Sequence, residues 1–284
     1  MKITWNKFKK LINNDLKDGW IFRGTIDDWG LKTTLERYCK ASGIKQEDQA
    51  GVEYELIREI QRKAYLISDI SIPPDPDMLW WVSLMQHHGA PTRLLDWTYS
   101  PYIAAYFAFE KKFKLLVDKE DDESEVVVMA LNAKRINVER ESNNRTDDIS
   151  YIKRILKDIK NSKPHILDFL FEKAEKCNFS PFVLEVNPYH LNKRLSIQQG
   201  IFLMQTNISK NFEENLKNTI GNLKNKENIM KFVITNTSKK NVLKILESLY
   251  RMNINHTSLF PGFDGFAQSL QTRIKFLSTL IKKR

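Results

Sequence analysis

The sequence has few of the features that mark a disulfide-rich, metal-binding or membrane-spanning protein. Its 284 residues contain two cysteines, Cys39 and Cys177, which lack the close spacing of zinc ligands and suggest no disulfide framework. No apolar run approaches the roughly 20 residues that a membrane-spanning helix needs. The opening residues, MKITW, do not form a secretory signal. These absences predict a cytoplasmic protein without a bound metal or a membrane partner.

The chain also lacks internal repeats and low-complexity linkers. Hydrophobic residues make up 42% and charged residues 28%, as is usual for globular proteins. We therefore expect a single domain over residues 1–284. Helix and strand signals alternate without a strict βαβ pattern, which predicts an α+β fold with a compact mixed or antiparallel sheet wrapped by helices.

Hydrophobic periodicity places the main elements. Residues 1–18 carry apolar side chains at helical spacing and predict an amphipathic helix that packs on the rest of the domain. The run from Glu110 to Glu125 is rich in charge and predicts a solvated loop or helix end. Strands are expected at 20–24, 126–131, 182–186, 201–205 and 230–235, and a loop at 137–148. Helices are expected at 53–67, 78–86, 149–176 and 238–251. A last helix begins at Asp264, and Phe266, Leu270, Ile274 and Leu277 would face inward from it.

Residues 84–109 hold an unusual density of polar side chains between two apolar runs. Gly89 and Pro91 predict a turn after the preceding helix. Ser100 followed by Pro101 predicts a new helix, since serine can cap it and proline loses nothing at the first helical position. The N-terminal end of that helix suits an anionic group such as a phosphate. The alternative is a capped helix with a structural ion pair between Arg93 and Asp96.

Two other positions have side chains able to bind a ligand. Arg23 ends a strand that reads as buried, so it must be paired or face a ligand, and Gly24 would let a ligand approach the backbone. Gln198 and Gln199 precede a glycine and an apolar strand, where an amide can donate to and accept from a ribose or an amide-bearing ligand. Equally, each amide could bond its own backbone.

The net charge of +10 favours polyanionic partners such as nucleic acid. Much of this charge lies in helices rich in Lys and Asn and in the last residues, 281–284. A solvated basic face is the plainer interpretation.

Several blocks of this sequence resemble the FRG domain, a family named for a Phe-Arg-Gly motif near its N-terminus. Phe22-Arg23-Gly24 stands where that motif belongs, and residues 86–109, QHHGAPTRLLDWTYSPYIAAYFAF, resemble the family's hallmark segment. The blocks RLSIQQGIF at 194–202 and LFPGFDG at 259–265 also fit, in the family's order. His88 stands where the resemblance implies an aromatic residue.

The same blocks are more faintly similar to arginine-type ADP-ribosyltransferases, which imply an ADP-ribosyltransferase-like fold and NAD as a substrate. Those enzymes carry an aromatic-Arg-Gly on the first strand, a Ser/Thr-rich segment before an Ala-Phe-Ala-like helix, and a Gln or Glu near a later strand. The resemblance implies that residues 22–24, 92–100 and 194–200 line one cavity. The implied catalytic residues are Arg23, Thr98, Ser100, Gln199 and His87, and the implied NAD-binding residues are Arg23, Gly24, Thr92, Arg93, Asp96, Thr98 and Gln198.

One departure affects the expected mechanism. The ADP-ribosyltransferase pattern ends in a catalytic glutamate, where this chain has glutamine, and glutamine cannot act as a general base. His87 or Glu185 is the expected substitute, because a neutral histidine can accept a proton near physiological pH.

The first hypothesis is an NAD-consuming ADP-ribosyltransferase-like enzyme, as in a toxin or a phage-defence effector. It would modify nucleic acid or protein, and an antitoxin or another regulatory partner could restrain it. The second hypothesis is a non-enzymatic module that binds nucleic acid or a nucleotide in the same pocket. A nuclease built from His87, His88 and Asp96 is the third, although the sequence has no metal-ligand spacing to support it.

Overall fold

A computed structural model describes residues 1–16, 19–26, 31–67, 71–119, 121–136, 165, 167–171, 180–188 and 193–281. The predicted loop at 137–148 and nearly all of the predicted helix at 149–176 lie outside these residues. The described helices are α1 (Trp5–Asn14), α2 (Thr34–Ala41), α3 (Gln49–Ala64), α4 (Met78–His87), α5 (Pro101–Asp118), α8 (Lys193–Ile197), α9 (Phe212–Ile220), α10 (Lys239–Arg251), α11 (His256–Leu259) and α12 (Phe263–Ile281), with short 3-10 turns at Gln46–Asp48 and Asp168–Phe171.

The strands form one seven-stranded sheet in the order β1-β7-β4-β2-β3-β6-β5. The pair β1–β7 is parallel and the other neighbours are antiparallel, so the predicted mixed sheet of an α+β fold is confirmed. The strands are β1 (Lys2–Ile3), β2 (Trp20–Ile26), β3 (Leu94–Thr98), β4 (Val126–Asn132), β5 (Val183–Val186), β6 (Gly200–Gln205) and β7 (Ile229–Ile234).

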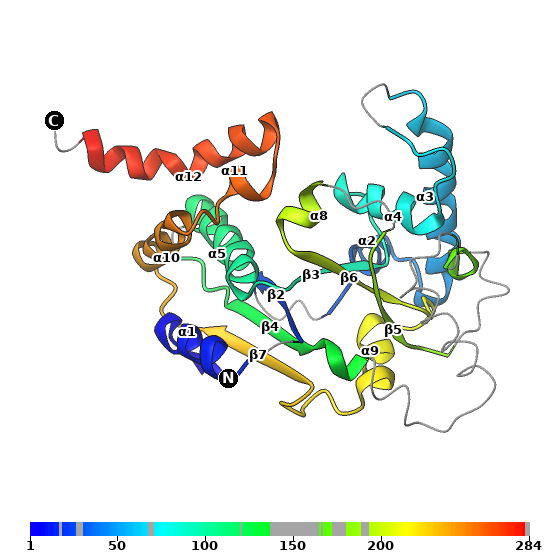
Figure 1. Cartoon of the computed structure of the whole chain (residues 1–284), viewed down its shortest axis with the longest axis horizontal. Coiled ribbons are helices and arrows are strands. Elements are labelled where there is room, and N and C mark those ends of the chain that lie inside the picture. Colours follow the sequence, from blue (N-terminus) through cyan, green and yellow to red (C-terminus); the bar gives the residue numbers. More distant parts are fainter. Residues whose placement is uncertain are drawn as a thin grey trace.

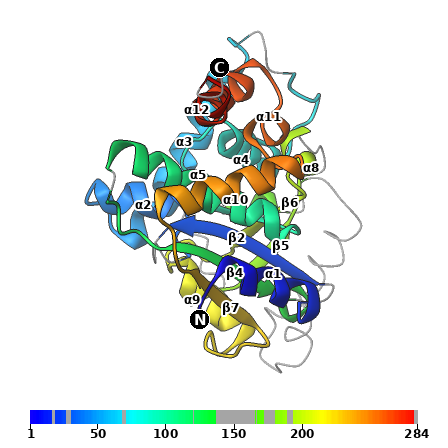
Figure 2. The same ribbon diagram turned by 90° about the vertical axis from the view of Figure 1, so that its left-hand side faces the viewer.

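Helices cover the sheet in separate groups (Figure 1). On one side, α1, α5 and α10 pack on β4, β2 and β7 around Phe8, Phe109 and Phe232, which are fully buried. A second core around Leu94 and Met204 lies between β3, β6 and β5 and the helices α3 and α4. The opposite side of the sheet buries Leu203 and other apolar residues against α9, and Figure 2 shows α9 across the strands from α5 and α10.

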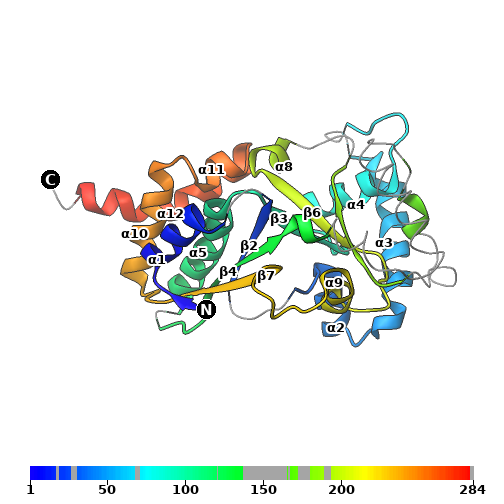
Figure 3. The ribbon, with the colours of Figure 1, turned by 60° about the horizontal axis from the view of Figure 1, so that its bottom comes forward.

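The two helix groups lie at opposite ends of the sheet, and the strands β2, β3 and β6, which line the cavity described below together with α5 and α8, lie between them. In Figure 3 the group of α1, α5 and α10 is separated from α3 and α4 by the strands. The alternation of side chains along each strand explains the arrangement, because neighbouring residues of β3 and β6 contribute to different cores. For example, Leu94 belongs to the core under α3 and α4, whereas Leu95 belongs to the core on the opposite side.

Several expectations were wrong in detail. Helix α5 continues to Asp118, so Glu110 and Lys112, which the sequence placed in a solvated segment, are buried. Lys112 is accommodated because its Nζ donates to Oδ1 of Asp122 at 2.6 Å. The predicted inward face of α12 is also wrong, because Phe266, Leu270 and Ile274 are exposed by 40%, 42% and 68%, respectively.

Candidate functional site

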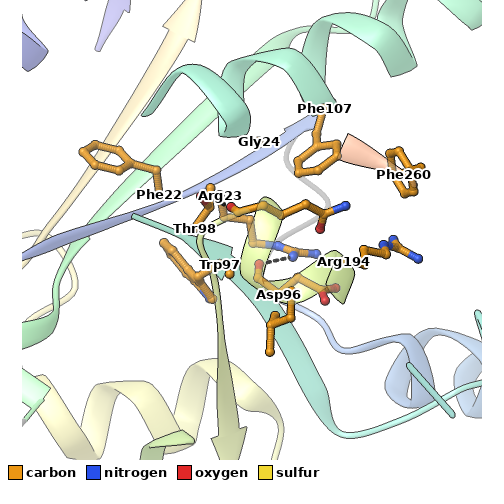
Figure 4. A pocket seen from close by; sticks show the side chains of 12 residues that line it. Phe22, Arg23, Gly24, Asp96, Trp97, Thr98, Phe107, Arg194 and Phe260 are labelled. Carbon is orange, nitrogen blue, oxygen red and sulfur yellow. Dashed lines mark hydrogen bonds between the residues drawn. The ribbon is translucent and has the colours of Figure 1, made fainter. Parts of the chain in front are cut away.

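The candidate site lies where the sheet divides. Strand β2 pairs with β4 over its full length, but with β3 it shares a single register pair, Phe22 with Thr98. Beyond that pair the two strands separate, and a cavity of about 180 Å³ opens beside them. Figure 4 shows side chains from β2, β3, α5, the α8 region and the segment after α11 around this cavity. The lining residues are Phe22, Arg23, Gly24, Asp96, Trp97, Thr98, Phe107, Arg194, Leu195, Gln198, Gly200 and Phe260.

The segments 22–24, 92–100 and 194–200 therefore all contribute to one cavity, as the resemblance to ADP-ribosyltransferases implies. Sheet topology brings them together, because β3 lies between β2 and β6. Thr98 is paired with Phe22 on one side and with Gly200 on the other. Residues distant in the sequence are thus fixed within one strand spacing of each other.

Arg23 spans the opening between β2 and β3. Its Nη1 donates to the carbonyl oxygen of Asp96 at 2.6 Å, which satisfies an acceptor on β3 after the strands have separated. Burial lowers the pKa of the Arg23 guanidinium, and the positive charge of Arg37 lowers it further. The negative charge of Asp96 raises it in part. Arg23 therefore joins β2 to β3 through this hydrogen bond and also places its positive charge beside the cavity.

Asp96 supplies the one carboxylate among the described residues that line the cavity. Its Oδ2 accepts a hydrogen bond from Nε2 of Gln86 at 2.6 Å. The Oε1 of Gln86 in turn accepts from Oγ1 of Thr92 at 2.5 Å. Thr92 is buried and does not line the cavity, so it orients Asp96 through Gln86.

Arg194 lies on the other side of Asp96 from Arg23 (Figure 4). Its guanidinium lies over the ring of Phe260, with Cζ 4.4 Å from the centroid, a geometry typical of a cation–π contact. Its Nη1 donates to the carbonyl oxygen of His87 at 3.0 Å. Burial lowers the pKa of Arg194 and the charge of Asp96 partly restores it.

Thr98 and Gln198 connect β3 to the segment before β6 and to α11. Oγ1 of Thr98 donates to the backbone carbonyl of Gln198 at 2.7 Å and accepts from the backbone N–H of Ser100 at 3.0 Å. The side-chain Nε2 of Gln198 donates to the carbonyl of Leu259 in α11 at 3.0 Å. The Gln198 amide thus binds the backbone of a distant element and lies at the cavity.

Arg93 lies elsewhere. It is 2% exposed, its Nε donates to Oε2 of Glu53 at 2.6 Å, and its Cζ is 4.7 Å from the ring centroid of Phe171. The alternative of an ion pair between Arg93 and Asp96 is therefore wrong, since Glu53 on α3 takes that role, and the implied NAD-binding role of Arg93 is not supported either. Arg93 joins β3 to α3 and does not line the cavity.

Three other predicted residues are also absent from the cavity lining. Ser100 caps α5, as predicted, with its Oγ accepting from the N–H of Ile103 at 3.3 Å. Gln199 is exposed and adopts a left-handed backbone with φ 48°. The His87 ring packs against His88 at 4.8 Å between centroids, and burial together with the charges of Arg194 and His88 lowers its pKa.

Glu185, the other expected base, lies on β5 and accepts from the Tyr99 hydroxyl at 3.2 Å. Burial and the charge of Glu185 raise the pKa of Tyr99 to about 12. Neither residue lines the cavity. Asp96 is thus better placed than His87 or Glu185 to act on a bound molecule.

Gly24 lines the cavity, but its lack of a side chain has another cause. A Cβ atom there would lie 1.7 Å from the carbonyl oxygen of Ala104 in α5. The glycine is needed because α5 packs directly on β2.

The sequence reasoning assigned no role to Arg194, Phe107 or Phe260. They lie in the segments 194–202, 86–109 and 259–265, respectively, and Arg194 follows no strand or helix signal of its own. An arginine four residues before a glutamine pair, and an aromatic residue before Pro261, were the available signals. Only the fold shows that the two blocks meet, through the Arg194–Phe260 contact.

The electrostatics of the cavity favour an anion. Among the described residues that line it, the two cations Arg23 and Arg194 outnumber the one carboxylate, Asp96. Guanidinium groups bind phosphate with two parallel hydrogen bonds. Within the described part of the chain, no cluster of three or more His, Cys, Asp or Glu side chains could hold a metal, and no helix there is long and apolar enough to cross a bilayer.

The architecture is thus a seven-stranded sheet in which β2 and β3 separate, with a basic cavity where they part. The family model of the FRG domain matches residues 18–115, a range that contains β2, β3 and most of α5. The resemblance to the FRG family is therefore confirmed for this range. Neither the curated proteins nor the solved structures include a match to this chain.

Proposed function

We propose that this protein is an ADP-ribosyltransferase-like enzyme that consumes NAD in the cavity between β2 and β3. The observation that carries the proposal is the convergence of residues 22–24, 96–98 and 194–200 on one basic cavity. The ADP-ribosyltransferase pattern requires the same segments to meet. Cleavage of the bond between nicotinamide and ribose needs a clamp on the pyrophosphate and a negative group near the developing positive charge.

The described side chains can divide this work. Arg23 and Arg194 would bind the pyrophosphate, since two guanidinium groups can form charge-assisted hydrogen bonds with it. The rings of Phe107 and Phe260, with centroids 6.0 Å apart, offer apolar surface for the nicotinamide. The amide oxygen of Gln198 would accept from the ligand, because its Nε2 is already committed to Leu259.

Asp96 would replace the glutamate of the ADP-ribosyltransferase pattern. A carboxylate stabilises an oxocarbenium-like centre by its charge and can accept a proton from the acceptor group. Gln86 fixes one of its oxygens. The acceptor molecule would be a nucleic acid or a protein, drawn by the net charge of +10, and an antitoxin-like partner could restrain the enzyme.

Nicotinamide release tests this proposal. The purified chain is incubated with NAD alone and with RNA, DNA or protein acceptors, and Arg23→Ala, Asp96→Asn and Arg251→Ala are compared with it. Arg251 is a matched control, because its side chain is 76% exposed on α10 in an ion pair with Glu247. We expect at least a hundredfold loss of rate for Asp96→Asn, in line with the loss of one transition-state contact, and no change for Arg251→Ala. No release with any acceptor would count against the enzyme.

A second function is favoured by one observation: the part of the lining that the structure describes contains a single carboxylate, already bonded to Gln86. A non-enzymatic module that binds a nucleotide or nucleic acid would need the arginines but no acid or base. It predicts NAD left intact and, for nucleic acid, binding that weakens steeply with salt. Asp96→Asn would then strengthen binding of an anion, because it removes a negative charge from the cavity.

A further inference from the structure

We propose that Glu110 and His256 are positioning residues, which hold α11 and, through Phe260, set the place of Arg194 in the cavity. This inference rests on the proposed function for its ligand. None of the sequence patterns pointed to either residue. Both are buried, although neither lines the cavity.

The anchor is a buried hydrogen-bonded group on α5 and α11. Nδ1 of His256 lies 2.6 Å from Oε1 of Glu110, and the same oxygen accepts from the Tyr106 hydroxyl at 2.9 Å. Burial raises the pKa of Glu110, but the His256 hydrogen bond and the charges of Lys114 and His256 outweigh it, so the pKa lies below its usual value. The carboxylate is therefore ionised and holds the imidazole.

Helix α11 depends on this anchor because it is only one turn long. It spans His256–Leu259 and its N-terminus is closed by a capping box between Asn255 and Ser258. A single turn is marginal by itself. Its place on the domain is therefore set by what it contacts, including the core around Leu259 and Glu110 through His256.

A chain of ring contacts then leads to the cavity. The His256 ring is stacked on Phe260, with centroids 4.3 Å apart and planes at 16°. Phe260 also meets Phe107 edge to face at 6.0 Å and carries the Arg194 guanidinium on its ring at 4.4 Å. From the same turn, the Leu259 carbonyl accepts from Gln198. Release of α11 would thus loosen an arginine and an amide of the cavity together.

Binding of ADP-ribose, measured by titration calorimetry, tests the inference. Glu110→Gln should raise the Kd at least tenfold, whereas Lys114→Gln should leave it unchanged. Lys114 is the matched control, because it is on the same helix, 3.9 Å from the same carboxylate oxygen, and half-exposed. Thermal unfolding of each variant identifies any that fails to fold.

A double-mutant cycle separates positioning from general destabilisation. Because Glu110 acts through Arg194 as well as Gln198, the losses of ADP-ribose binding caused by Glu110→Gln and Arg194→Ala should be less than additive in the double variant. Full additivity of the two effects would overturn the inference. At His256, substitution by Asn keeps a donor near the position of Nδ1 and loses the ring, and substitution by Phe does the reverse. Both should weaken binding, because both links of the chain are needed.

A readout without ligand keeps this inference distinct from the proposed function. The side-chain Nε–H signal of Arg194 in the NMR spectrum of the free protein should shift in Glu110→Gln and stay in place in Lys114→Gln. An unchanged Arg194 signal in folded Glu110→Gln contradicts the inference. If the signal shifts but the wild-type chain binds neither ADP-ribose nor NAD, the proposed function fails and the positioning role stands.

Discussion

At the scale of single residues, the side chains of residues 92–100 serve two different purposes. Asp96 and Thr98 face the cavity, whereas Arg93 is sealed against Glu53. All three are polar and close in sequence, so residue type alone did not separate them. The structure separates them, because Arg93 lies just before β3 and reaches Glu53 of α3, whereas Asp96 and Thr98 lie within the strand beside the cavity.

The buried pair of Arg93 and Glu53 should be critical to stability. Glu53→Gln leaves a guanidinium in the interior without its counter-charge, which typically costs about 3–5 kcal/mol of unfolding free energy. Both side chains of the pair are 2% exposed. Urea unfolding followed by circular dichroism measures the loss.

Glu59→Gln is the matched control for that experiment. Glu59 lies on the same helix, α3, and its pair with Lys63 is exposed by 59% at the carboxylate. Solvent screens such pairs, so its removal should change stability little. Equal effects of the two substitutions would contradict a structural role for Arg93.

The lowered pKa of Glu110 predicts a defined pH dependence. Because its folded pKa lies below its unfolded value, Glu110 contributes stability that is present above the usual glutamate pKa of about 4.3 and is lost as the pH falls through the folded pKa. In urea unfolding between about pH 3 and 7, Glu110→Gln should flatten the acid limb of the stability curve. A stability curve parallel to that of the wild type would mean that Glu110 has the same pKa in the folded and unfolded states, which would contradict this prediction.

At the scale of elements, local chemistry was predictable and tertiary partners were not. Ser100 and Pro101 gave the start of α5 correctly, because capping depends on neighbouring residues only. Strand β3 was not predicted, because five residues with one exposed aspartate show no clear alternation. The buried state of Glu110 was also missed, since its partner His256 is 146 residues away.

The contact between β2 and α5 gives a direct test of element packing. Gly24→Ala would place a methyl group 1.7 Å from the Ala104 carbonyl, and the strand and helix would have to move apart. Overpacking of this kind typically costs about 1–3 kcal/mol, and more when backbone is displaced. We expect a clear fall in the melting temperature.

Gly51→Ala serves as the control. Gly51 lies in α3, and a Cβ there meets nothing within 4 Å. Alanine favours a helix by up to about 1 kcal/mol over glycine. Gly51→Ala should therefore keep or raise the melting temperature, and a Gly24→Ala variant as stable as wild type would contradict the described packing.

At the scale of the whole molecule, the pattern of helix and strand signals predicted an α+β fold, and the resemblance to ADP-ribosyltransferases implied one cavity built from three segments. It did not predict the face of α12. Apolar spacing shows that a helix has an apolar side, but it does not show what covers that side. Phe263, Phe266, Leu270 and Ile274 are all exposed in this chain.

Stability should follow this distribution of apolar side chains. Phe8 of α1 is fully buried and Phe263 of α12 is 81% exposed. Phe8→Ala should cost about 3–5 kcal/mol, and Phe263→Ala should change the unfolding free energy by less than about 0.5 kcal/mol. Denaturant unfolding of both variants tests whether the core and α12 are as described.

The most direct test of the central claim is a crystal structure of the protein with ADP-ribose. The account predicts the pyrophosphate between Arg23 and Arg194, with guanidinium nitrogens within about 3 Å of its oxygens, and a ribose next to Asp96. ADP-ribose bound at another surface, or an empty cavity at millimolar ligand concentration, would contradict the claim that this cavity is the site for NAD.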